Sequence, residues 1–96
     1  MSTLEARRPR RGEGILAAEL AEVRMLSDRG RYNEARSLAQ KLLDEHPSDA
    51  DVHTAMGDVC SAEGMWNEAV RWYSASLELE FDPKVMEFLA AARARA

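Results

Sequence analysis

Apolar residues recur every three to four positions along most of this chain, which is the spacing of one face of an α-helix. The pattern starts near Ile15 and continues in blocks that contain, for example, Leu16, Leu20, Val23 and Leu26, then Val52, Met56, Val59 and Cys60. Breaks fall at Gly30, at 46–49, at Gly64 and at 82–83. Strand-like alternation is absent from the sequence. The pattern therefore predicts an all-α protein of about five helices, roughly 11 to 15 residues each, with neighbours antiparallel because the connections are short.

Several helix starts are marked by a short polar side chain that can accept hydrogen bonds from first-turn amides. The expected N-caps are Asn33, Ser48, Asn67 and Asp82. Ser48 stands three residues before Asp51, which resembles a capping box, and Asp82 precedes Pro83, whose fixed φ suits the first helical position. Gly64 is expected to end its helix in the left-handed conformation.

The chain also resembles itself at a distance of 34 residues. Gly30 aligns with Gly64, Tyr32 with Trp66, and the Asn-Glu-Ala run 33–35 with 67–69. Two helices in 34 residues is the period of the tetratricopeptide repeat. The second copy resembles that family most closely, through Gly57, Gly64, Trp66, Tyr73 and the runs 67–69 and 77–79.

The first copy is a weaker match, because Val23 and Ala39 stand where the family has glycine and an aromatic residue. The resemblance implies a short right-handed α-solenoid of antiparallel helix pairs. It divides the chain into a leader (1–14) and a repeat domain (15–96), the latter made of repeat 16–49, repeat 50–83 and capping helix 84–95. The small Gly57 and Ala69 are expected where the two helices of the second repeat cross most closely.

What the resemblance implies about function is a concave surface lined by the first helix of each pair, which receives a segment of a partner protein. The matching positions are Ala17, Leu20, Arg24, Ser27 and Asp28, with Asp51, Thr54, Asp58, Ser61 and Ala62. A second expected contact surface is the outer edge of the first helix, where a preceding repeat would stack: Ala18, Ala21 and Met25. Covering that edge with another copy would give a homo-oligomer.

One subfamily binds acidic C-terminal peptides of chaperones through lysines and asparagines. The matching positions here are Leu20, Arg24, Ala55, Val85 and Leu89. Four of these five side chains lack the chemistry to hold a carboxylate, so this ligand class is not expected.

Charge is unevenly divided along the chain. The formal net charge is -4, but residues 1–14 hold four arginines (Arg7, Arg8, Arg10 and Arg11) and carry a net charge of +2. The leader is expected to be disordered. An alternative function follows from it, because arginines attract phosphate: a nucleic-acid or ribonucleoprotein accessory factor acting through the leader. The acidic remainder makes nucleic acid a less favoured partner than protein.

Candidate chemistry in the sequence is sparse. His46, His53 and Cys60 recur every seven residues, but only the last two share a predicted helix, about 10 Å apart, which is too far for one metal ion. No phosphate loop or nucleophile motif occurs, so we expect no enzyme, no metal and no cofactor. A single cysteine suits a reducing compartment, which favours the cytoplasm. The apolar runs are too short to span a membrane, so no insertion is expected.

Overall fold

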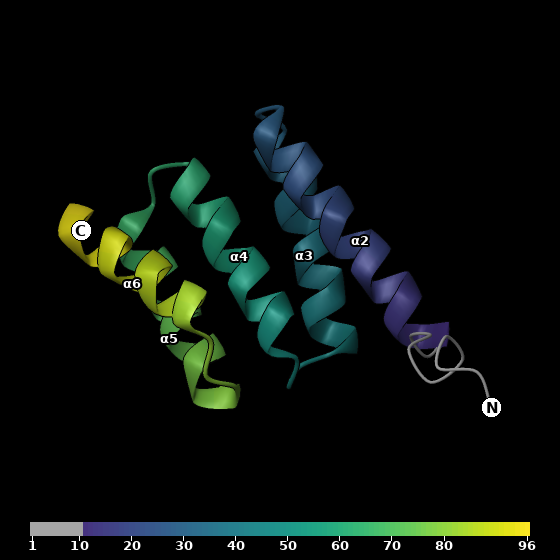
Figure 1. Ribbon diagram of the computed structural model, residues 1–96. Coiled ribbons are helices and arrows are strands. Elements are labelled where there is room, and N and C mark those ends of the chain that lie inside the picture. The colour runs from purple at the N-terminus through teal and green to yellow at the C-terminus, as the bar shows by residue number, and fades with distance from the viewer. Residues whose placement is uncertain (1–10) are drawn as a thin grey trace.

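The computed structural model describes residues 11–96, and the side chains from residue 14 onward. Five α-helices follow one another in this part of the chain, and no strand interrupts them (Figure 1). The helices are α2 (Arg11–Asp28), α3 (Tyr32–Glu45), α4 (Ala50–Ala62), α5 (Trp66–Leu79) and α6 (Pro83–Arg95). The predicted all-α class and the number of helices are confirmed.

The first helix is longer than the sequence predicts. It spans 18 residues and begins at Arg11, inside the stretch 1–14 that we expected to be a leader. The two glycines in this stretch lower helix stability by about 1 kcal/mol each relative to alanine, which weakens a helix but does not prevent one. The rest of the expected leader, 1–10, lies outside the described residues.

The helices form two layers. Figure 1 shows α2, α4 and α6 side by side in front, with α3 and α5 behind them, and the first and last described helices at opposite ends of the array. The front helices α2 and α4 each continue through a short turn into a helix behind, α3 and α5. The first helices of the two pairs and the last helix thus share a layer, so one face of the molecule belongs to α2, α4 and α6.

Two glycines make the tight turns between layers. Gly30 and Gly64 have φ angles of 77° and 79°, the left-handed region that favours glycine. The amide of Arg31 then donates to the carbonyl oxygen of Leu26 at 2.9 Å, and that of Met65 to Cys60 at 2.8 Å. These are the bonds of a Schellman motif, and the expectation for Gly64 is confirmed.

The predicted caps are partly wrong. Asp82 accepts from the Lys84 amide at 2.9 Å with Pro83 in the first turn, as expected. In α4, however, Asp49 rather than Ser48 is the cap, and its Oδ1 accepts from the amides of Asp51 at 2.9 Å and Val52 at 3.2 Å.

Asn33 and Asn67 are not caps at all. The second helix of each pair begins at the preceding aromatic residue, Tyr32 or Trp66, and has no side-chain cap. Each asparagine therefore lies one residue inside its helix, too far along to accept from the first-turn amides. Of the two aromatic residues, Trp66 packs against the core of the C-terminal half.

The core has two clusters, and the second fixes the position of the last helix. One cluster joins α2, α3 and α4, and the other joins α4, α5 and α6. The buried residues of α6 are Val85, Leu89 and Ala92, which follow the buried Val52, Met56 and Val59 of α4 by 33 residues. The helix α6 thus repeats α4 at a spacing of 33 rather than 34, a register that the sequence alone left open.

Candidate functional site

A groove of about 570 Å³ runs between α2 and α4, in the layer at the front of Figure 1. Its walls come from these two helices alone. They supply Ala17, Leu20, Ala21, Val23, Arg24, Ser27 and Asp28 from α2, and Asp51, Thr54, Ala55, Asp58, Val59 and Ala62 from α4. Most of these side chains are small, so the floor is shallow and apolar while charges stand along it.

The structure brings together nine of the ten residues predicted for the concave surface. They are Ala17, Leu20, Arg24, Ser27, Asp28, Asp51, Thr54, Asp58 and Ala62. Ser61 does not line the groove. It is half-buried, with its hydroxyl 3.1 Å from that of Tyr73. Whether a partner binds to these residues stays a prediction.

The predicted edge contact divides into two parts. Ala18 and Met25 are exposed outside the groove, Met25 to 42%. Ala21, in contrast, is exposed but lines the groove. The reason is the helical period, which places Ala21 one turn after Ala17 on the side that faces α4.

A polar network behind the groove holds Asp58. The Tyr73 hydroxyl of α5 donates to Asp58 Oδ1 at 2.7 Å. Burial raises the pKa of Asp58, and this hydrogen bond and the charge of Arg24 oppose that rise. The pKa of Tyr73 is itself raised by burial. The sequence singled out Tyr73 only as part of the family resemblance, and no sequence signal indicated its hydrogen bond to Asp58.

A second pair of hydroxyl groups links α5 to α4 behind the groove. Thr54 Oγ1 and Ser76 Oγ lie 2.7 Å apart. Both hydroxyls reach the carbonyl oxygen of Ala50, at 3.1 Å from Thr54 and 3.0 Å from Ser76. Thr54 was predicted as a lining residue, but the buried Ser76 was not singled out. These bonds fix the first turn of α4, where Asp51 stands.

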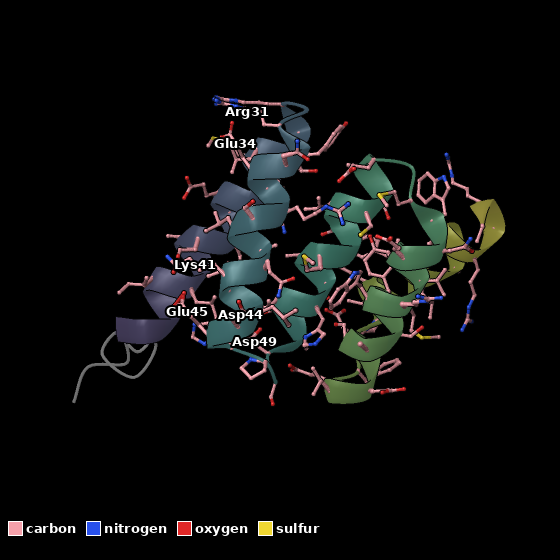
Figure 2. All side chains as sticks on the ribbon, turned by 180° about the vertical axis from the view of Figure 1, so that it is seen from behind. Arg31, Glu34, Lys41, Asp44, Glu45 and Asp49 are labelled. Atoms are coloured by element: carbon pink, nitrogen blue, oxygen red, sulfur yellow. The ribbon has the colours of Figure 1, made fainter. Side chains whose placement is uncertain are left out.

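The charges of the groove differ from those at the back of the molecule. Figure 2, seen from behind, shows Arg31 beside Glu34 and Lys41 near Glu45 on α3; their ion-pair distances are 3.2 Å and 3.9 Å. Within residues 14–96, no ion pair includes Arg24 or any of the groove carboxylates Asp28, Asp51 and Asp58. Burial is also the main cause that raises the pKa of Asp51, reinforced by the charges of Asp49 and Asp82. Among the groove carboxylates, Asp58 is held by its hydrogen bond to Tyr73 rather than by an ion pair.

The histidines and the cysteine lie apart from this groove. The buried His53 packs its ring against Trp72, with ring centroids 5.8 Å apart. Cys60 is buried, and burial raises its pKa to about 11, so the unreactive thiol form dominates near neutral pH. His46 follows the end of α3. No three potential metal ligands of the His, Cys, Asp and Glu types gather within the described part of the chain.

A family model described as "Tetratricopeptide repeat" matches residues 26–94. The chain belongs to the tetratricopeptide repeat family. Such repeats generally mediate protein-protein interaction, and the family is generally non-catalytic. The comparisons with curated proteins and with solved structures gave no match.

The match begins near the end of α2, so most of one groove wall lies before it. No helix within residues 11–96 has both the length and the hydropathy to cross a membrane.

The register of α6 corrects one assignment made by resemblance to the chaperone-binding repeats. Val85 and Leu89 are buried, only 4% and 5% exposed. With α6 at a spacing of 33 from α4, the positions that face the concave side move back by one residue, to Lys84 and Phe88. Leu20, Ala55 and Phe88 still offer no polar group to a carboxylate, whereas Arg24 and Lys84 do.

Proposed function

We propose that this tetratricopeptide repeat protein is a non-catalytic interaction module that binds a segment of a partner protein in the groove between α2 and α4. The observation that supports the proposal is the groove itself. It joins the first helices of successive repeats, and its walls combine an apolar floor with charged groups that have no ion-pair partner among the described residues. Such a combination is typical of ligand sites, where apolar contacts give affinity and a few polar groups give orientation.

The outer edge of α2 is a weaker candidate for the partner. The corresponding positions of α4, which pack against the first repeat, are Val52, Met56 and Val59, all buried. At the place that matches Met56, the first repeat has the charged and exposed Glu22. A charge in the middle of a small apolar strip opposes stacking of another helix there, because the carboxylate would lose its water.

Two neighbouring alanines on α2 allow a direct test. Ala21 lines the groove and Ala18 does not, yet both are exposed on the same helix. We expect Ala21→Phe to fill the groove and to abolish capture of partner proteins from native lysate, whereas Ala18→Phe leaves the captured set unchanged. Quantitative mass spectrometry measures capture, and circular dichroism confirms that both variants fold.

The reverse pattern would contradict the groove and favour the outer edge. If both variants capture the same proteins as the wild type, neither surface binds the partner and the proposal is wrong.

A further inference from the structure

The charge of the groove indicates what kind of partner it fits. Its lining contains three carboxylates and one guanidinium: Asp28, Asp51, Asp58 and Arg24. A smaller recess continues from Asp51 and Thr54 and adds Glu80 and Asp82, with no basic side chain in its lining. The linings of the groove and of this recess together therefore carry excess negative charge, which attracts a positively charged ligand.

Two of the groove carboxylates lie on α4. Asp51 and Asp58 are seven residues apart, about 10.5 Å along the helix axis. A polyproline II segment has three residues per turn and rises about 3.1 Å per residue, so its side chains at i and i+3 lie on the same side, about 9.3 Å apart. Basic side chains at positions i and i+3 of a segment in this conformation thus reach both carboxylates.

Asp58 is already held in place for such a contact. Tyr73 donates a hydrogen bond to its Oδ1 at 2.7 Å, which limits rotation of the carboxylate before a ligand arrives. Preorganisation of this kind reduces the entropy lost on binding. The second oxygen of the carboxylate has no hydrogen bond to any other described side chain.

On these grounds, and resting on the proposed function of the groove, we infer that its partner is an extended, positively charged protein segment with arginine or lysine at every third position. Asp51 and Asp58 bind successive basic side chains, and Asp28 adds negative charge from the opposite wall. Arg24 is the one cation in the lining, so it weakens the attraction and leaves room for an acidic or polar group at a single place in the partner.

The test uses the full chain and three synthetic peptides of nine residues. The first has arginine at every third position (Ala-Arg-Ala-Leu-Arg-Ala-Leu-Arg-Ala), the second replaces each arginine by glutamate, and the third clusters the three arginines. Isothermal titration calorimetry at about 0.1 M salt, where charges beyond about 10 Å are screened, gives the affinities. We expect the spaced arginine peptide to bind at least tenfold more tightly than the glutamate peptide, and severalfold more tightly than the clustered one.

Single substitutions locate the contact. Asp51→Asn and Asp58→Asn remove one charge each and keep an acceptor oxygen, so each should weaken binding of the spaced peptide three- to tenfold. Arg24→Gln should strengthen it two- to fivefold. The matched control is Asp44→Asn on α3, an exposed carboxylate on the opposite face (Figure 2), which should have no effect.

Each contrary result overturns the inference in a distinct way. Equal binding of the glutamate peptide, no saturable binding of the spaced peptide, or equal weakening by Asp44→Asn excludes a basic ligand in this groove. Equal binding of the clustered peptide excludes the every-third-position spacing.

If removing residues 1–10 raises the affinity tenfold or more, the chain's own arginines occupy the groove and the assignment to a partner is wrong. If the peptides fail while Ala21→Phe still abolishes capture, the groove function stands and only the charge assignment falls.

Discussion

The two repeats differ in which helix carries the larger side chain where their two helices cross. In the second repeat, Gly57 lies where an added Cβ would come within 2.6 Å and 2.7 Å of ring atoms of Tyr73. In the first repeat the matching pair is Val23 and Ala39, and both are buried, at 1% and 0% exposure. The larger residue thus sits on the second helix in one repeat and on the first helix in the other. What the crossing preserves is the combined volume of the pair, since a packed core tolerates exchange of residues better than a change in total volume.

The exchange has a consequence for the groove. Only the repeat with tyrosine on its second helix sends a hydroxyl through to the concave side, where it holds Asp58. The position that matches Asp58 in the first repeat is Arg24, and the packing residue behind it is alanine. One repeat therefore contributes an oriented anion and the other a cation without that support.

A second pair of matching positions differs in chemistry rather than in size. Leu42 of α3 is fully buried in the N-terminal cluster. Its counterpart in α5 is Ser76, equally buried but hydrogen-bonded to Thr54 and to the Ala50 carbonyl. The same place in the helix pair is held by apolar contact in one repeat and by hydrogen bonds in the other.

The largest predicted effect comes from placing a large residue at both positions of the Gly57 and Tyr73 pair. Gly57→Val should destabilise the protein by about 2 to 3 kcal/mol, because the new atoms collide with the Tyr73 ring. Adding Tyr73→Ala recreates the valine and alanine of the first repeat, so the double variant should be less destabilised than the sum of the two single variants, by about 1 to 2 kcal/mol. Urea denaturation of the four proteins measures this coupling. Strict additivity would show that the two positions do not share one space.

An intermediate effect compares the matching positions Leu42 and Ser76. Leu42→Ala should cost about 2 kcal/mol, the lower end of the range for a leucine truncated in a core. Ser76→Ala should cost about 1 kcal/mol, the net value of a hydrogen bond, because Thr54 still reaches the Ala50 carbonyl. Chemical denaturation checks both. A serine variant as unstable as the leucine variant would mean that the hydroxyl pair holds α5 in place more strongly than apolar contact holds α3.

Much of the fold could be predicted from the sequence because its strongest signals are local. The glycines at the turns and the 34-residue period identify the helix pairs, and the resemblance to the tetratricopeptide repeat implied ten concave positions, of which nine line the groove. The expected close crossing at Gly57 is also confirmed. The helix pairs need only helical geometry and the conformational preferences of glycine, whereas the groove positions needed the family resemblance as well.

The details that escaped prediction depend on contacts or on a shift of one residue. Ser48 and Asp49 have similar capping chemistry, so the sequence could not choose between them. The spacing of 33 between α4 and α6 is set by how α6 packs, as Val85 and Leu89 show. The sequence does not show whether Tyr73 only packs or also orients Asp58. The structure shows the second role, through the distance of 2.7 Å between the Tyr73 hydroxyl and Asp58 Oδ1.

The smallest predicted effect concerns the carboxylate that distinguishes the second repeat. The pKa of Asp58 is raised by burial above its ordinary value of 3.8, so the folded protein binds this proton more tightly than the unfolded chain does. Protonation therefore favours folding, and this contribution is fully present below the ordinary pKa and is lost as the pH rises through the raised one. At neutral pH the ionised carboxylate lowers stability.

Asp58→Asn isolates the effect of the Asp58 charge on folding stability, because it keeps an oxygen for the Tyr73 hydroxyl and removes the charge. We expect the variant to be more stable than the wild type at neutral pH, with a difference that narrows as the pH falls toward 3.8, because the wild type then carries a neutral group too. Urea denaturation at a series of pH values measures both proteins, and Asp44→Asn serves as the exposed control. A difference that instead widened on acidification would mean that the Tyr73 hydrogen bond and Arg24 stabilise the ionised form more than burial disfavours it. In that case the charged form of Asp58 would stabilise the fold. Its role would then be to stabilise the second repeat rather than to bind a cation.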